Sequence, residues 1–333
     1  MRKYTAEAIL IFYIVALSLI VGCGTQSVRK TLSQEDSATD IPYIIISQDT
    51  FDSDNFSIIT AAKKMDERGI IKLLAVDITG NDTGNGASRL FSMLLWGKDV
   101  PIFVNHATYS RATPSSQPYD LNAYPNDGIP DSQRTDSTEG LAQLLSTLPE
   151  GKKAIYVVGG HLTNIADLVD AYPEVVREKI SQVVISTGWS DRTSGKPEIN
   201  LSRGTYEPTP VSRATQRFFA HVPKSVKVVI ASDPDAPYPK VPVDWITDNV
   251  LRYLVINGHY YKHDGYFYMG DFEALLYGAV GTRWYDVQWA REVKTCFRIN
   301  DYGAARVASG ECNHYYLDDV RSDIAMQIFK ELI

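Results

Sequence analysis

The sequence predicts an α/β fold with a mostly parallel central sheet and helices on both of its faces. Apolar runs of strand length alternate with amphipathic segments of helical spacing through most of the chain. This alternation of strand and helix requires right-handed crossovers, which place parallel strands side by side. The runs are almost wholly apolar, as expected for strands that are covered on both faces.

The elements follow in order from the first apolar run. Pro42–Ser47 predicts a buried strand, and Phe56–Arg68 predicts a helix because Phe56, Ile59 and Ala62 recur at helical spacing. After Arg283 the pattern changes to short strand candidates. The remaining expected elements are strands at Lys72–Thr79, Pro101–Asn105, Ala154–Val158, Val183–Ser186 and Val226–Ala231, and helices at Ala87–Leu95, Gly140–Leu148, Thr163–Ala171, around Trp245–Asn257, and at Asp319–Leu332.

The first 22 residues have the pattern of a lipoprotein signal segment. Arg2 and Lys3 precede the apolar run Ala8–Val21, which is shorter than the roughly 20 residues of a membrane-spanning helix. The run ends in Ile20-Val21-Gly22-Cys23, which resembles a lipobox, so we expect cleavage before Cys23 and acylation of its thiol. A plain membrane anchor followed by a chance cysteine is the alternative.

Residues 23–41 are polar with little to bury, and they predict a flexible tether to one domain at 42–333. We therefore expect a lipid-anchored protein of the bacterial cell envelope, outside the cytoplasm. The net charge of −7 comes without a Lys/Arg cluster, which argues against nucleic acid as a partner. Cys296 and Cys312 either pair, as export allows, or remain buried thiols. The oligomeric state is open, and a homo-oligomer is one alternative.

An acidic loop follows the first strand, at the edge where open parallel sheets bind ligands. Asp49, Asp52 and Asp54 fall within six residues at the start of a helix. Capping of the helix needs one or two carboxylates. Three converging carboxylates repel each other unless a cation neutralises them, and hard oxygen ligands suit Ca²⁺ or Mg²⁺. Metal binding and capping both remain open at this point.

An ordered set of motifs resembles the inosine–uridine-preferring nucleoside hydrolase family. Asp49 and Asp54 match the first and last essential aspartates of that family's N-terminal motif. The block Gly159–Ala166 looks like its Gly-Gly-Leu-Thr-Asn-Ile-Ala block, with His161 inserted. The other matches are Thr79-Gly80-Asn81, Asn126-Asp127-Gly128-Ile129, Glu198-Ile199-Asn200, and Asp264-Gly265 followed by Gly270-Asp271.

The resemblance implies a Rossmann-like fold of the nucleoside hydrolase type and the hydrolysis of ribonucleosides to free base and ribose, for purine or pyrimidine salvage. It implies Ca²⁺ held by Asp49, Asp54, the carbonyl of Thr163, and Asp271, with oxygen donors that suit this ion. Asp49 would act as general base toward a metal-activated water. Ribose hydroxyls would be held by Asn81, Glu198 and Asn200.

Simpler interpretations of these residues remain open. Asn81 could only form a turn, Thr163 and Asp271 could only cap helices, and Glu198 and Asn200 could be solvated loop residues.

Two departures from the family pattern bear on activity. Ser53 replaces the first of two adjacent aspartates, and Gly270 replaces a histidine near the leaving base. His263, in a tyrosine-rich stretch that either stacks on a base or packs as surface, is a candidate leaving-group acid. Three hypotheses follow: a nucleoside hydrolase, a calcium-containing lipoprotein that binds a sugar or nucleoside without turnover, and a hydrolase of another ribosylated substrate.

Overall fold

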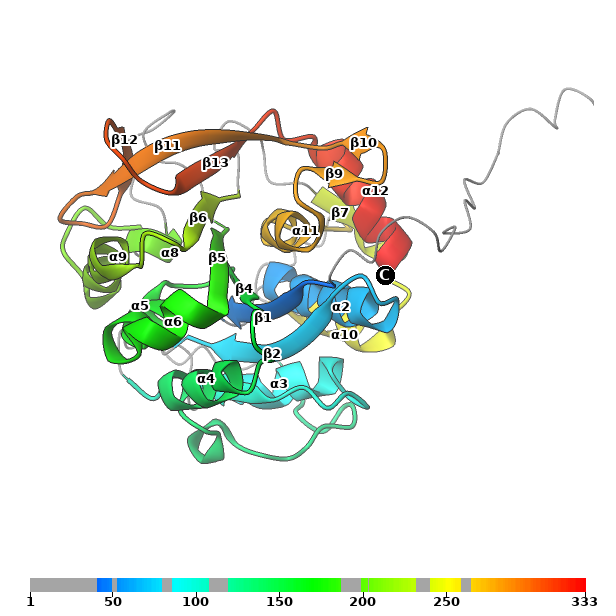
Figure 1. Cartoon of the computed structure of the whole chain (residues 1–333). Coiled ribbons are helices and arrows are strands. Elements are labelled where there is room, and N and C mark those ends of the chain that lie inside the picture. The colour runs from blue at the N-terminus through cyan, green and yellow to red at the C-terminus, as the bar shows by residue number, and fades with distance from the viewer. Residues whose placement is uncertain are drawn as a thin grey trace, which may run out of the picture. The chain divides into compact units, whose positions relative to one another are not determined.

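A nine-stranded sheet forms the centre of the protein in the computed structural model (Figure 1), with the order β12-β11-β13-β6-β5-β4-β1-β2-β3. The neighbouring strands from β13 to β3 all pair in parallel, whereas β11 pairs antiparallel with both β13 and β12. The predicted fold class is therefore confirmed. The strands are β1 (Tyr43–Gln48), β2 (Lys72–Ile78), β3 (Ile102–Val104), β4 (Ala154–Val158), β5 (Ile180–Ile185), β6 (Lys227–Ile230), β11 (Arg291–Ile299), β12 (Ala305–Ala308) and β13 (His314–Asp318), with two small ribbons formed by β7 (Lys240–Pro242) with β8 (Tyr266–Tyr268) and by β9 (Arg283–Trp284) with β10 (Val287–Gln288).

The structure describes residues 41–49, 53–79, 86–107, 119–186, 199–202, 204–231, 240–258 and 265–333, all within one compact unit, Ile41–Ile333. The signal segment 1–22, Cys23 and nearly all of the tether 23–41 lie outside these ranges and stay predictions. No helix in the described ranges has both the length and the apolar character needed to cross a membrane.

Helices cover both faces of the sheet because successive strand residues point to opposite sides. In β1, Ile44 and Ile46 join one buried apolar cluster and Ile45 joins the other. Figure 1 shows the two helical layers on opposite sides of the strands. The first cluster is covered by α2 (Ser53–Glu67), α3 (Ala87–Leu94), α10 (Asn249–Asn257), α11 (Phe272–Val280) and α12 (Ser322–Leu332), and the second by α4 (Ser137–Ser146), α5 (Thr163–Ala171), α6 (Pro173–Lys179), α8 (Ile199–Ser202) and α9 (Pro210–His221).

The expected helix around Trp245–Asn257 is shorter than the sequence pattern indicated. A 3₁₀ turn, η2 (Val243–Trp245), precedes it, and α10 begins at Asn249. The side chain of Asp248 accepts hydrogen bonds from the backbone N–H groups of Val250 and Leu251, both at 3.0 Å. This N-cap sets the start of the helix. The pattern alone also missed α6, α8 and α9.

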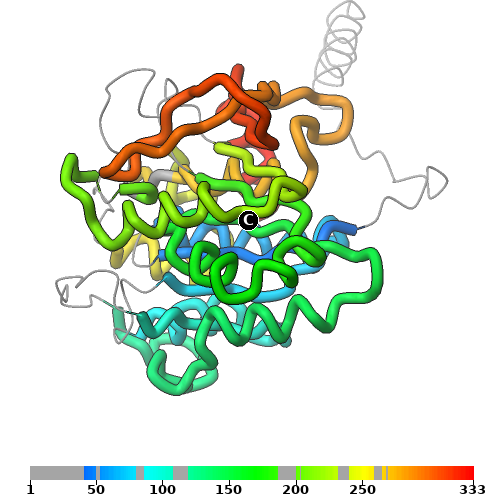
Figure 2. The backbone as a smooth tube through the Cα atoms, turned by 60° about the vertical axis from the view of Figure 1, so that its left-hand side comes forward, coloured from blue at the N-terminus to red at the C-terminus, as the bar shows by residue number. Residues whose placement is uncertain are grey.

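Strand order determines where a ligand site can form. From β1 the chain builds outward through β2 and β3 on one side, and later through β4, β5 and β6 on the other. Figure 2 shows the C-terminal strands in orange and red at one edge of the sheet and the early strands near the other. Connections leave β1 and β4 in opposite directions, and at such a switch point a ligand crevice is expected beyond the carboxyl ends of the strands.

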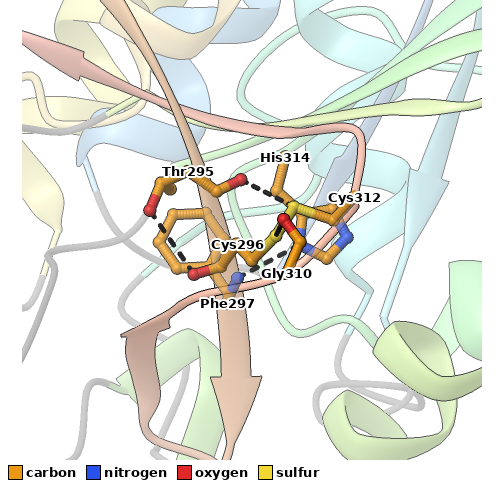
Figure 3. The surroundings of a disulfide bond; sticks show 6 residues. All are labelled: Thr295, Cys296, Phe297, Gly310, Cys312 and His314. Carbon is orange, nitrogen blue, oxygen red and sulfur yellow. Dashed lines mark hydrogen bonds between the residues drawn. A yellow bond between two sulfur atoms is a disulfide. The ribbon is translucent and has the colours of Figure 1, made fainter.

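The far edge of the sheet contains a disulfide. Cys296 on β11 bonds to Cys312, which precedes β13 (Figure 3). The His314 ring stacks on Phe297, and its Nδ1 accepts a hydrogen bond from the Phe297 N–H at 3.2 Å. Burial lowers the pKa of His314. The two cysteines left open by the sequence are therefore paired.

Candidate functional site at the switch point

The backbones of β1 and β4 meet closely where both strands end. Gly159 N–H donates to the carbonyl of Ser47 at 2.8 Å. A Cβ at Gly160 would lie 2.3 Å from the Asp49 backbone nitrogen, and a Cβ at Gly159 would lie 2.1 Å from Gln48 Nε2 and 2.3 Å from Asp271 Oδ2. Only glycine fits both positions without moving these atoms. The Gly-Gly pair therefore brings the two strand ends and the segment before α11 together.

The side-chain amide of Asn55 lies at the centre of this crevice. Its Nδ2 donates to Gln48 Oε1 at 2.5 Å, to Asp49 Oδ1 at 3.0 Å and to Asp271 Oδ2 at 3.3 Å. Asn55 is 2% exposed and Asp271 is 3% exposed. Two carboxylates from opposite ends of the domain thus converge on one nitrogen atom.

Asp54 does not join this group. It occupies the first turn of α2, next to Asn55, and its Oδ1 accepts from the Asn55 backbone N–H at 3.0 Å. Consecutive helical residues point about 100° apart, so the side chain of Asp54 leaves α2 in a different direction from that of Asn55. Burial raises the pKa of Asp54 to about 6. Across the residues that the structure describes, no three acidic, histidine or cysteine side chains gather in a way that could hold a metal ion.

Asp271 and Thr163 both stand at helix starts, but neither uses its side chain as a cap. Asp271 precedes α11, and its carboxylate makes no capping hydrogen bond. Thr163 is the first residue of α5, whose N-cap is Leu162. The Thr163 hydroxyl, which is fully buried, donates to Asn164 Oδ1 at 3.1 Å. Thr163 therefore begins α5 and Asp271 holds the N-cap position of α11, as the simpler interpretations expected, but neither side chain makes a capping hydrogen bond.

Asn200 lies at the other side of the crevice, on the short helix α8. Its Nδ2 donates to the carbonyls of Gly159 at 3.0 Å and Ser186 at 2.9 Å. These two bonds join the chain segments that follow β4 and β5. Asn200 is 7% exposed, so it is a buried positioning group rather than a solvated loop residue. The other expected site residues, Asn81, Glu198 and His263, lie outside the described residues.

The sequence interpretation missed two side chains at the centre of the site, Gln48 and Asn55. Both flank expected aspartates, and strand alternation at the end of β1 turns Gln48 into the interior, where it is fully buried. Among the described residues, Gln48 Nε2 has no hydrogen-bond acceptor. The sequence feature that could have identified them is their position, since Gln48 precedes Asp49 and Asn55 follows Asp54.

Asp77, within β2, is a second missed group. It is fully buried and accepts hydrogen bonds from Ser137 Oγ at 2.5 Å, from Asn164 Nδ2 at 2.7 Å, and from the Tyr156 hydroxyl. Burial raises the pKa of Asp77 to about 6, although these donors oppose the shift. Through Asn164 and Thr163, this carboxylate fixes the start of α5 beside the crevice.

The parallel sheet with polar side chains at its switch point defines an α/β protein of the doubly wound class, in which ligands bind beyond the carboxyl ends of the strands. Comparison with solved structures identifies the fold within that class as the nucleoside hydrolase fold. No family model matches the sequence, and no curated protein matches it.

Three of the similar structures match this chain over almost their whole length. A purine-preferring ribonucleoside hydrolase from Gardnerella vaginalis has a TM-score of 0.65 at 13% identity, over 87% of this chain and 97% of that one. An inosine–uridine-preferring nucleoside hydrolase from Bacillus anthracis has a TM-score of 0.60 at 13% identity, over 88% and 99%. The type III effector protein XopQ, solved in complex with adenosine diphosphate ribose, has a TM-score of 0.59 at 17% identity, over 88% and 94%.

Proposed function

We propose that this protein hydrolyses the N-glycosidic bond of a ribonucleoside or a related ribosylated compound, releasing free ribose or a ribosyl product. The observation that carries the proposal is the convergence of Asp49 Oδ1 and Asp271 Oδ2 on Asn55 Nδ2 at the switch point. The similar structures support the substrate class, because their names refer to inosine, uridine, purine ribonucleosides and adenosine diphosphate ribose.

The chemistry follows from the two carboxylates. Glycosidic cleavage passes through an oxocarbenium-like state, in which positive charge develops on the ribose ring. Asp271, held in a buried site, would stabilise that charge electrostatically. Asp49, which lies nearer the surface, would accept the proton of the attacking water as general base. Asn81 and Glu198 would bind ribose hydroxyls, and His263 would protonate the leaving base.

Asn200 would contribute to catalysis by holding two segments of the site in place. Its amide nitrogen joins the segments after β4 and β5, which fixes the wall of the crevice. Holding the sugar and the water in a rigid frame lowers the entropic part of the barrier. The Asn200 amide oxygen is the end that we assign to a ribose hydroxyl.

Calcium is the part of the expected chemistry that the described residues fit least. The oxygens of Asp49, Asp271 and Gln48 suit a hard cation, but the point where they converge is occupied by Asn55 Nδ2. Ca²⁺ takes six to eight oxygen ligands, including waters, and among the described residues no three acidic, histidine or cysteine side chains gather to hold it. We therefore assign no catalytic step to a metal ion.

A ribose-release assay across purine and pyrimidine nucleosides tests the proposal. We expect Asp49→Ala to lower kcat/KM by at least about 100-fold, the usual contribution of a general base. Asp286→Ala is the matched control, because Asp286 is exposed on the β9–β10 turn. Equal ribose release by the wild type and Asp49→Ala would contradict the assignment of the base.

A binding protein without turnover is the second candidate. The neutral amides of Gln48 and Asn55 at the centre of the site favour it, since they weaken the negative field that an oxocarbenium-like state requires. Binding of ribose or a nucleoside by calorimetry, with no ribose release from any nucleoside, would favour this function over hydrolysis.

We further propose that the mature protein is anchored by lipid at Cys23 on the outside of the cytoplasm. The Cys296–Cys312 disulfide supports this location, because disulfides persist in oxidising compartments outside the cytoplasm. Nucleoside hydrolysis there would supply bases and ribose for salvage.

A further inference from the structure

We propose that the amide of Asn55 takes the place of a metal ion between the carboxylates, so that the protein as it stands binds Ca²⁺ only weakly. The inference rests on the proposed function only in assigning this crevice as the active site. Asn55 Nδ2 occupies the point where Asp49 Oδ1 and Asp271 Oδ2 converge.

Three side-chain oxygens surround one nitrogen atom at this point. Gln48 Oε1, Asp49 Oδ1 and Asp271 Oδ2 lie at 2.5, 3.0 and 3.3 Å from Asn55 Nδ2. A primary amide carries two N–H donors with partial positive charge. These donors supply some of the attraction that a cation would supply between two carboxylates, and a hydrogen bond to a charged acceptor is stronger than one to a neutral acceptor.

The Asn55 amide also excludes a cation sterically. Asn55 is 2% exposed and sits on the first turn of α2, whose position is set by the packing of that helix against β2, α10 and α11. Ca²⁺–oxygen distances are about 2.3–2.6 Å, so a cation and the amide nitrogen cannot both occupy the point between the carboxylates. Binding of the ion requires the amide to leave and its hydrogen bonds to break.

The number of negative charges at this point also differs from that of a cation site with three carboxylates. Two carboxylates, Asp49 and Asp271, converge at this point, and Gln48 and Asn55 add neutral amides. Asn55→Asp replaces the donor with a third carboxylate at the same position. The variant would place three negative groups together, and these repel each other unless a cation binds.

Calorimetric titration of CaCl₂ into the full chain, purified in detergent and stripped with chelator, tests the inference. We expect Asn55→Asp to bind one Ca²⁺ at least tenfold more tightly than the wild type. Without calcium, Asn55→Asp should unfold at a lower temperature than the wild type, and added Ca²⁺ should restore it. Asn257→Asp is the matched control, since it makes the same charge change at an exposed position on α10 and should leave calcium affinity unchanged.

Asn55→Ala keeps the test decisive if Asn55→Asp does not fold. It removes the amide without adding charge, so calcium affinity should rise above that of the wild type. Tight, one-to-one Ca²⁺ binding by the wild type, or no gain in affinity in either variant, would overturn the inference. Ribose release is measured separately, so a wild type without hydrolysis but with this pattern of calcium affinity would leave the inference standing and refute only the hydrolase.

Discussion

Replacement of Asp77 by asparagine should change the pH dependence of stability. Asp77 is a fully buried carboxylate in β2 that accepts hydrogen bonds from neutral donors on Ser137, Asn164 and Tyr156. Burial raises its pKa from 3.8 to about 6. The folded state therefore holds the proton more tightly than the unfolded state does, and ionisation of Asp77 destabilises the fold as pH rises from about 4 to 6.

The magnitude follows from the shift in pKa. One pKa unit corresponds to about 1.4 kcal/mol, so a shift of roughly two units costs about 3 kcal/mol of unfolding free energy above pH 6. Asp77→Asn keeps an acceptor oxygen for Ser137 and Asn164, and its new NH₂ group can donate to the Tyr156 hydroxyl oxygen. We expect Asp77→Asn to be more stable than the wild type at pH 7.5 by up to about 3 kcal/mol, or roughly 5 °C in Tm.

Denaturant unfolding of both proteins at pH 4.5 and pH 7.5 measures this effect. The control is Asp66→Asn. Burial acts to raise the pKa of Asp66, but hydrogen bonds from Lys98 and the Leu73 N–H outweigh it and lower that pKa. Ionised Asp66 therefore stabilises the fold above about pH 4, and Asp66→Asn should lose stability at pH 7.5. A difference between wild type and Asp77→Asn that stays constant from pH 4.5 to 7.5 would refute the reasoning.

Three further predictions concern the crevice, the sheet edge and the anchor. Gly159→Ala should lower ribose release more than tenfold, because its Cβ would displace the buried side chains of Gln48 and Asp271; ribose release at the rate of the wild type would contradict this. Cys296→Ser should lower the free energy of unfolding by about 3 kcal/mol, since the disulfide closes a loop with a sequence separation of 16; an unfolding midpoint in denaturant that is insensitive to reductant would argue against it. Cys23→Ala should move the protein from the membrane pellet to the soluble fraction, and continued sedimentation with membranes would refute lipid attachment at this residue.

Much of the fold could be predicted from local patterns. β4 and α5 have the predicted bounds, β2 and α3 end one residue earlier than predicted, and β1 begins and ends one residue later. These elements are long apolar runs or strongly periodic segments, and burial on both faces of the sheet leaves little freedom in their assignment. The region around Trp245 was wrong because the cap at Asp248, a single side chain, decides where α10 begins.

The sequence predicted at which edge of the sheet the site lies, but not which side chains point into it. The acidic loop after β1 and the Gly-Gly turn after β4 follow from the rule that ligands bind beyond the carboxyl ends of strands. Which side chain points inward there depends on the phase of the strand and of the first helical turn. At the end of β1 and the start of α2, that phase places Gln48 and Asn55 in the interior, where their side chains hydrogen-bond to each other.

The sequence by itself determined the class of fold, the order of its elements and the residues that could meet at one rim of the sheet, because apolar periodicity and glycine pairs are local properties of the chain. Only the tertiary structure decided that Asp49 and Asp271 converge on an amide nitrogen, that Asp77 is buried beside neutral donors, and that Cys296 pairs with Cys312. The physical reason is that hydrogen bonding and electrostatic interaction act over a few ångströms. Distances of that size between residues far apart in the chain are set by how strands and helices pack, and one residue of phase moves a side chain from the centre of a site to its outside.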